Sequence, residues 1–434
     1  MEQLSYFKFP VSALLGITFI LVNYLIYRHF SKSRVVSYLS GLRCASVLIS
    51  VVAAVIAVEG VWGIKLHLTW PFWILCLLMC ISLIFCIMRR IEGSSTKQTF
   101  PQFSISRLSF IFTHLGFLLI ILGGFFGAAD ITKANIIAMR NTSSDIAFDS
   151  EHLKVQLPFS IRLEDFTIDY YDDNRSPKQF TSTITITDSK RKDATQRSLK
   201  TSVNNPCSYN GYRIYQEGYD TINGNYSILK IVRDPYIPIV YLGMLLLFIG
   251  AAASLVGRWS TRTLITAIAI LAIAFGFASV RRINFEMLPP ALRNWLFAPH
   301  LILYMAAYSA MSIALIFSLL STFKPKAESE SEGKYAVLTD KLVRTSSVLL
   351  LMGMLCGCIW AQQAWGSYWE WDPKECWAAV TWLLSLLYMH IKPLKKKSST
   401  TALIIIAITF IALQITWYGV NYLPSASASM HTYN

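Results

Sequence analysis

The sequence predicts a polytopic α-helical membrane protein, with about ten transmembrane helices and one inserted β-rich domain outside the membrane. Of its 434 residues, 54% are hydrophobic and 15% are charged. Soluble globular chains carry about 25% charged residues. Long apolar runs recur along the chain, and a single polar stretch, residues 129–235, interrupts them. A mean hydropathy of +0.45 excludes an ordinary soluble enzyme, a disordered protein and a collagen-like chain.

Ten apolar runs are expected to be membrane spans, most of them near the roughly 20 residues that a bilayer core requires. They are residues 11–27, 44–57, 70–88, 108–128, 236–256, 264–280, 301–320, 346–360, 377–390 and 402–420. The second, eighth and ninth runs are short. The first run lacks the basic n-region and the cleavage site of a secretory signal, so it is expected to be a retained helix.

Positive charge concentrates in the alternate loops that the ten spans place inside. These loops are residues 28–43, 89–107, 257–262, 321–344 and 392–400, which together hold 19 Lys and Arg and 5 acidic residues. Their excess equals the whole formal charge of +14. The positive-inside rule then predicts both termini and the β domain outside. Because the topology explains the charge, no nucleic-acid partner is expected.

The stretch 129–235 is expected to be a small extracytoplasmic β domain. It carries 14 basic and 14 acidic residues, and segments such as Phe180-Thr-Ser-Thr-Ile-Thr-Ile-Thr alternate with period two. Turn signals such as Asn210-Gly211 separate these segments. The predicted organisation is therefore an N-terminal membrane region, 1–128, the β-rich domain, 129–235, and a C-terminal membrane region, 236–434.

The eight cysteines show neither disulfide-framework nor zinc spacing, and we expect them to be small buried residues. Without a Cys-x-x-Cys-His sequence, the chain is not itself a c-type cytochrome.

Two histidines lie in or at the end of predicted spans. His114 lies inside the fourth span, where an ionisable group is costly and hence a functional candidate. His390 closes the ninth span, where it either snorkels to the interface or binds a ligand. The topology places both toward the cytoplasmic leaflet, so they can face each other across one metal ion.

A second possible pair lies on the outer side. His300 precedes the seventh span, and His431 follows the tenth. Each alone reads as an interfacial or tail residue. Two histidine pairs at two depths suit six-coordinate haem iron better than zinc, which usually takes a third or fourth ligand. The other three histidines, His29, His67 and His152, are expected to be solvated surface residues.

Residues 365–377 form a predicted outer loop with four tryptophans and a tyrosine, namely Trp365, Tyr368, Trp369, Trp371 and Trp377. One reading is an interfacial aromatic belt. At the end of the loop, Asp372-Pro-Lys-Glu375 predicts a capping box that opens the next helix. Neither reading explains the density of indoles, whereas an aromatic-lined platform suits a porphyrin face.

This loop, Trp365-Gly-Ser-Tyr-Trp-Glu-Trp-Asp-Pro-Lys-Glu-Cys-Trp377, resembles the WWD signature of the haem-handling superfamily, in its CcsA (ResC) branch. Three other segments resemble CcsB (ResB): Arg107-Leu-Ser-Phe-Ile-Phe-Thr-His-Leu-Gly, Gly211-Tyr-Arg-Ile-Tyr-Gln-Glu-Gly-Tyr-Asp and Asp234-Pro-Tyr-Ile-Pro-Ile-Val-Tyr-Leu-Gly. Residues of about 100–434 therefore resemble a compact CcsBA fusion of system II cytochrome c biogenesis. The CcsA-like half has about five predicted spans, fewer than expected of a full member.

The resemblance implies roles for the four histidines. His300 and His431 correspond to the outer haem ligands of the family, and His390 and His114 to its two membrane histidines. The loop residues Trp365, Tyr368, Trp369, Trp371, Asp372 and Trp377 are expected to bind haem.

The resemblance also implies an activity, that of a holocytochrome c synthase, with no side chain assigned as catalytic. Ferrous haem b would enter from the cytoplasmic side, pass outward and join the Cys-x-x-Cys-His segment of apocytochrome c through thioethers. A thioredoxin-like reductant would keep those thiols open, and lipids would surround the spans. Three alternatives remain: a haem exporter or chaperone without synthetase activity, a two-haem membrane redox protein, and a transporter of another solute.

Overall fold

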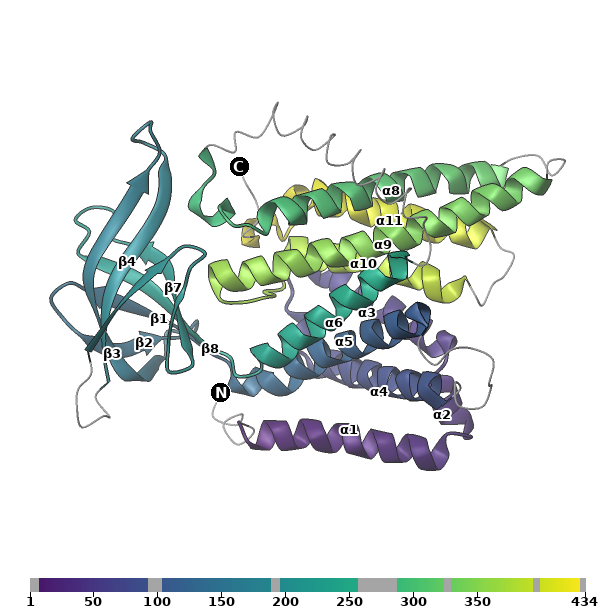
Figure 1. The fold of residues 1–434 in the computed structure, drawn as a ribbon, viewed down its shortest axis with the longest axis horizontal. Coiled ribbons are helices and arrows are strands. Elements are labelled where there is room, and N and C mark those ends of the chain that lie inside the picture. Colours follow the sequence, from purple (N-terminus) through teal and green to yellow (C-terminus); the bar gives the residue numbers. More distant parts are fainter. Residues whose placement is uncertain are drawn as a thin grey trace.

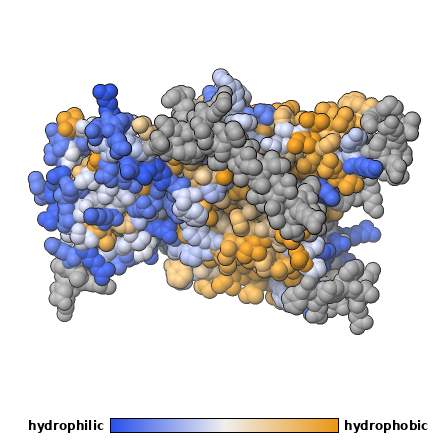
Figure 2. All heavy atoms as spheres, turned by 45° about the horizontal axis from the view of Figure 1, so that its top comes forward, coloured by the Kyte–Doolittle hydropathy of each residue, from blue (hydrophilic) through white to orange (hydrophobic). Residues whose placement is uncertain are grey.

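The computed structural model describes residues 8–92, 104–188, 196–256, 287–323, 329–392 and 399–429. Long helices lie side by side in one body, and a β-sheet packs at one end of that body (Figure 1). We call this end of the helices the sheet end and the opposite end the far end. Figure 2 shows hydrophilic residues over the sheet and broad hydrophobic areas over the helices, as expected for a protein that is only partly in a membrane.

The helices fall into two groups, before and after the sheet. The first group is α1 (Val11–Phe30), α2 (Arg34–Leu39), α3 (Leu42–Trp62), η2 (Leu66–Leu68), α4 (Trp70–Glu92), α5 (Ile105–Gly127) and η3 (Ala128–Asp130). The second is α6 (Ile237–Val256), η5 (Pro290–Leu292), α8 (Phe297–Phe323), α9 (Ser329–Trp365), α10 (Pro373–Ile391), α11 (Ser399–Trp417), η6 (Gly419–Tyr422) and η7 (Ala426–Ala428).

Eight of the described helices are long and apolar enough to cross a membrane: α1, α3, α4, α5, α6, α8, α9 and α11. Each contains or overlaps a predicted span, and the sixth predicted span, 264–280, lies outside the described residues. The predicted span 346–360 is the interior of α9, whose 37 residues reach about 55 Å, well beyond a bilayer core of about 30 Å.

The ninth predicted span forms α10, which does not meet the same criterion of apolarity. Lys374 and Glu375 lie in its first turn, and Thr381 and Ser385 are buried along it. Both hydroxyls have partners, because Thr381 donates to the Trp377 carbonyl at 2.8 Å and Ser385 to the Trp382 carbonyl at 2.6 Å. Because other helices surround α10, it tolerates polar residues that a lipid-facing helix would not.

The sheet is entirely antiparallel and has the strand order β5-β4-β3-β2-β1-β8-β7-β6. The strands are β1 (Thr132–Met139), β2 (Ser144–Phe148), β3 (Lys154–Tyr170), β4 (Pro177–Thr187), β5 (Gln196–Ser202), β6 (Cys207–Tyr209), β7 (Tyr212–Tyr219) and β8 (Tyr226–Arg233). β1 pairs with β8 along its length, from Thr132 opposite Arg233 to Met139 opposite Tyr226. This pairing places the entry to and the exit from the sheet side by side, so α5 and α6 emerge next to each other.

Alternating residues of the strands fill one core. In β1, Ala134, Ile136 and Ala138 are buried while residues between them are exposed or intermediate, as period two requires. Ile184 and Ile186 of the segment singled out in the sequence are fully buried. The prediction of an inserted β-rich region is confirmed.

Glycines bring α5 and α6 into backbone contact. A Cβ on Gly116 would lie 2.5 Å from the Gly243 carbonyl oxygen, and one on Gly250 would lie 2.8 Å from the Thr113 nitrogen. The Ser109 hydroxyl donates to the Gly250 carbonyl at 2.7 Å. Small residues allow such contacts between helices in membranes, where van der Waals packing and hydrogen bonds replace hydrophobic burial. The contact fixes the part of α5 that contains His114.

We expect Gly116→Ala to destabilise the protein by about 1–3 kcal/mol, the usual cost of overpacking, because the new methyl group meets backbone that cannot turn aside. The measurement is the melting temperature of the detergent-purified protein. Gly16→Ala in α1 is the matched control, since its Cβ would make an ordinary 3.4 Å contact with the Phe126 side chain. Equal melting temperatures for the two variants would contradict the close approach.

Candidate functional site

The sheet holds the segment that leads into α8. Asn204, which is buried and has a positive φ of 67°, donates from Nδ2 to the carbonyl oxygens of Pro290, Ala291 and Arg293 at 2.9, 3.2 and 3.2 Å. Trp360 of α9 donates to the Ala291 carbonyl from the other side, at 3.0 Å. Because buried carbonyls need donors, these contacts determine the path of the chain just before His300.

The sheet also contacts the tryptophan loop, residues 365–377, at the junction of α9 and α10. Lys133 of β1 donates to the Ser367 hydroxyl at 3.1 Å and to the Glu370 carboxylate at 3.0 Å. Burial raises the pKa of Glu370, but the charges of Lys133 and Lys230 and the hydrogen bonds from Lys133 and Ser367 together lower it below its usual value. A Cβ on Gly366 would lie 2.7 Å from Val232 of β8, and the φ of Gly366 is +78°. Only glycine suits that position.

The predicted capping box at the end of this loop is confirmed. The Asp372 side chain accepts from the Lys374 N–H at 2.8 Å, and the Glu375 carboxylate accepts from the Asp372 N–H at 3.2 Å. The Ser429 hydroxyl donates to the Asp372 carboxylate at 3.0 Å. Asp372 thus ties the loop to the C-terminal segment as well as to its own helix.

The aromatic side chains of the loop spread over different neighbours. Trp365 lies 5.9 Å from Trp360 of α9, between ring centroids. Trp369 meets Trp371 edge to face at 6.0 Å. The indole nitrogen of Trp377 faces Gly60 of α3, where a Cβ would lie 3.0 Å away. The Tyr368 hydroxyl lies against α5, 3.4 Å from the position of a Cβ on Gly124.

His300 lies in the first turn of α8 and packs against α9 rather than against the loop itself. Its Nδ1 lies 2.9 Å from the Gly353 carbonyl oxygen, and a Cβ on Gly357 would come within 2.9 Å of its ring. The ring meets Trp360 edge to face at 5.9 Å. Because the Trp360 ring contacts both His300 and Trp365, it links His300 to the start of the loop. His431, the other predicted outer ligand, lies outside the described residues.

The two histidines of the predicted inner pair lie on helices that contact each other. His114 belongs to α5 and His390 to α10, and the rings of Phe117 and Trp382 on these two helices meet edge to face with centroids 5.6 Å apart. In both histidines, Nδ1 lies 2.8 Å from the carbonyl oxygen four residues earlier, that of Phe110 or Leu386. This contact favours the tautomer with hydrogen on Nδ1, which leaves Nε2 as the nitrogen with a lone pair.

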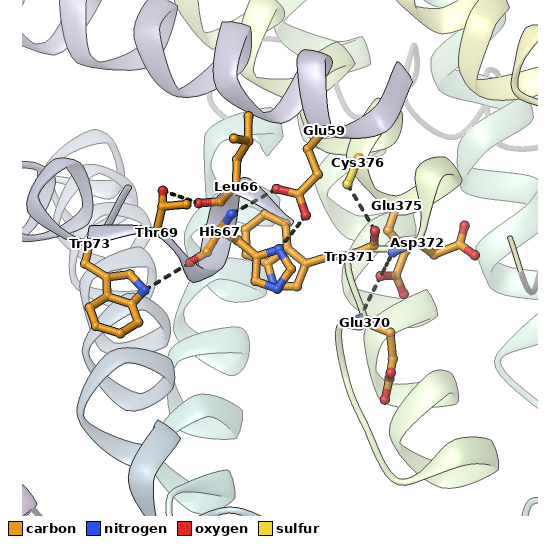
Figure 3. Close-up of polar contacts among 10 residues, drawn as sticks. All are labelled: Glu59, Leu66, His67, Thr69, Trp73, Glu370, Trp371, Asp372, Glu375 and Cys376. Atoms are coloured by element: carbon orange, nitrogen blue, oxygen red, sulfur yellow. Dashed lines mark hydrogen bonds and ion pairs between the residues drawn. The ribbon is translucent and has the colours of Figure 1, made fainter. Parts of the chain in front are cut away.

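The prediction that His67 is a solvated surface residue is wrong. Its side chain is only 16% exposed, and its Nδ1 forms a short contact with the Glu59 carboxylate, whose side chain is 4% exposed (Figure 3). The His67 backbone N–H donates to the same carboxylate at 3.1 Å. The imidazole stacks on the Trp371 indole with centroids 4.6 Å apart and planes 4° apart.

Local sequence explains how His67 returns to Glu59. Gly63 ends α3 with a φ of 67°, and its N–H donates to the Glu59 carbonyl at 2.8 Å. The chain then reverses through η2, and Trp73 of α4 donates to the His67 carbonyl at 3.0 Å. One signal was available in the sequence: Glu59 is an acidic residue directly after an apolar run, and such groups need partners.

The arrangement suits a large, flat, metal-containing ligand better than a bare metal ion. A histidine that binds a metal usually donates its other N–H to a carbonyl or carboxylate, and His114 and His390 have this arrangement. Their two Nε2 atoms come from different helices and would be the nitrogens available to hold a haem iron. At the sheet end, indoles and a tyrosine gather at one loop beside the segment that holds His300.

The protein is thus a polytopic helical membrane protein with an inserted β-sheet, histidines at both ends of its helical body and a tryptophan-rich loop under the sheet. Two family models match it in tandem. Residues 104–225 match the ResB-like family, and residues 236–426 match the cytochrome C assembly protein family. The chain is a fusion of a ResB-like half and a CcsA-like half, the composition of system II cytochrome c biogenesis proteins.

Curated relatives match part of the chain. Proteins named cytochrome c biogenesis protein CcsA are 40% identical over 93 residues in Amborella trichopoda and 32% identical over 154 residues in Chlamydomonas reinhardtii. These matches cover 21% and 34% of this chain and 29% and 42% of the relatives, respectively. The chain thus spans less than half the length of the relatives it matches.

Replacement of Asn204 tests how much its hydrogen bonds to the segment before His300 stabilise the protein. Asn204→Gly keeps the positive φ but removes the side-chain amide that donates to three carbonyls, two of which keep one other donor, from Trp360 and from the Arg293 N–H, so we expect a loss of about 0.5–1.5 kcal/mol. Asn204→Asp should cost more, because it places a carboxylate against three carbonyl oxygens. The measurements are the melting temperature and the protease sensitivity of residues 287–296.

Asn174→Asp is the matched control, because Asn174 also has a positive φ, 52°, but is exposed. If Asn204→Asp melted no lower than this control, the hydrogen bonds from Asn204 to the segment before His300 would not contribute to stability.

Proposed function

We propose that this protein matures c-type cytochromes: it accepts haem b at the far end of its helices, moves it to the sheet end and presents it there to an apocytochrome c. The observation that carries the proposal is the contact between α5 and α10, where the rings of Phe117 and Trp382 meet edge to face at 5.6 Å. α5 carries His114 and lies in the ResB-like half, whereas α10 carries His390 and lies in the CcsA-like half.

The entry site in this proposal is the inner pair. The Nε2 atoms of His114 and His390 bind the haem iron, while the carbonyls of Phe110 and Leu386 hold both rings in the required tautomer. Bis-histidine ligation keeps the iron six-coordinate, so it has no open position during transfer. Each half of the chain supplies one ligand of this site. The site therefore depends on the packing of α5 against its neighbours.

The exit site lies at the sheet end, which we take as the outer side. His300 supplies one ligand there and His431 the other, and the indoles of the tryptophan loop cover the porphyrin. The bond from Ser429 to Asp372 supports this assignment, because it brings the chain to the loop two residues before His431. The sheet supports the same loop through Lys133.

The attachment itself is redox-neutral. Each cysteine thiol of a Cys-x-x-Cys-His segment adds across one vinyl group: a sulfur–carbon bond forms, the vinyl π bond breaks, and the thiol proton ends on the other vinyl carbon. The histidine of the segment then replaces one outer ligand on iron. A thioredoxin-like reductant keeps the two thiols reduced beforehand. The protein contributes positioning and exclusion of water, and the haem contributes the reactivity.

The optical spectrum of the detergent-purified protein tests the four ligands. We expect a reduced bis-histidine haem spectrum in the wild type. His114→Ala or His431→Gly should weaken haem binding at the affected site at least about tenfold, since even groups behind metal ligands contribute about 10–100-fold. Added imidazole should restore the spectrum of His431→Gly by filling the vacated position.

The matched control is His29→Ala, because His29 is an exposed histidine at the far end whose Nδ1 also contacts a carbonyl, that of Leu25, at 3.1 Å. If all variants kept the wild-type haem content, the assignment of ligands would be wrong. Co-expression with an apocytochrome then separates attachment from export: thioether-linked haem in the client supports the synthetase, and haem delivered without thioethers supports an exporter.

A further inference from the structure

A buried acid–histidine pair lies under the tryptophan loop, in the part of the chain that precedes both family matches. Glu59 lies in the last turn of α3, and His67 lies in η2. The family matches begin at residue 104. Both carboxylate oxygens of Glu59 are used, one by the His67 ring and the other by the His67 backbone N–H. Such two-point contact fixes the orientation of the imidazole as well as its position.

The face of that imidazole supports Trp371. The two rings are nearly parallel (Figure 3). Phe72 of α4 meets the same indole edge to face at 5.5 Å. Helices from the N-terminal half thus contribute two of the contacts that surround this indole. Trp369 of the loop contributes a third.

Trp371 needs such support because its backbone is held in an unfavourable conformation. Its φ is +59°, in the left-handed region that large side chains rarely adopt. The Cys376 thiol donates to its carbonyl oxygen at 3.4 Å. A strained backbone persists only where surrounding contacts over-determine it. Among the ring contacts described for Trp371, the stack on His67 has the shortest distance between centroids.

We propose that Glu59 and His67 are positioning residues of the outer site: Glu59 orients His67, and the His67 ring holds the Trp371 indole, and with it the tryptophan loop, in the conformation that faces the haem. The importance of this conformation rests on the proposed function, but the support itself does not. Neither residue touches the haem in this proposal, so neither is catalytic.

Cys376 provides a readout that needs no haem. Its side chain is fully buried against α3, where a Cβ on Gly60 would lie 3.2 Å from the Cys376 Cβ. The Cys376 thiol also donates a hydrogen bond to the Trp371 carbonyl. We expect Glu59→Ala and His67→Ala each to raise the rate of Cys376 modification by N-ethylmaleimide at least about tenfold, the effect of losing about 1.4 kcal/mol of local stability. Peptide mass spectrometry separates Cys376 from the other cysteines.

Two further variants keep the test sharp. The double variant Glu59→Gln with His67→Phe keeps a flat ring under Trp371 and leaves no unpaired charge, so its Cys376 should be modified at close to the wild-type rate. Glu92→Ala is the matched control, because Glu92 forms an exposed ion pair with Arg28, at 3.4 Å, far from the loop. Unchanged modification in both single alanine variants, or no protection in the double variant, would overturn the proposal.

The same variants separate this inference from the proposed function. If His67→Ala exposes Cys376 and also shifts the midpoint potential or spectrum of the outer haem, both stand. If the wild type holds no haem but His67→Ala exposes Cys376, the proposed function fails and the positioning pair remains. If outer haem binds normally in His67→Ala while Cys376 stays protected, the positioning pair is refuted and the proposed function is untouched.

Discussion

Hydrogen bonds between the β-sheet and the two helix-connecting segments at the sheet end constrain the arrangement of the candidate site. Asn204 satisfies three carbonyls in the segment before His300, and Lys133 bridges Ser367 and Glu370 in the tryptophan loop. Buried backbone carbonyls without donors are costly, so these segments follow the sheet. The sheet is therefore part of the candidate site, because β1 and β8 contact the tryptophan loop through Lys133 and Val232.

The N-terminal helices take part in the same site although the family matches do not reach them. α3 packs along α10, with Gly60 against Cys376 and Trp377. The C-terminal segment returns to the same place, where the Ser425 hydroxyl donates to the Gly60 carbonyl at 2.6 Å. α3 and α4 therefore lie around the tryptophan loop together with helices of the CcsA-like half.

Three ionisable groups inside the described helices have a defined partner. His114 and His390 contact carbonyls of their own helices, and Glu59 is paired with His67. An unpaired charge in an apolar environment is strongly unfavourable, so such groups are kept where they have a use. For the inner pair this use is the proposed binding of haem iron, and for Glu59 it is the orientation of an imidazole.

Patterns in the sequence were enough to locate the long helices and the β region of this protein. Hydropathy alone identified nine of the described long helices, because a bilayer requires apolar runs of one length, and period-two alternation identified the β region. The capping box at Asp372 was readable because its residues lie three apart. Only the tertiary structure shows that α5, which carries His114, contacts α10, which carries His390, and that His67 stacks on Trp371. These residues are hundreds of positions apart, and local patterns report which face of a helix is apolar but not which helix will cover it.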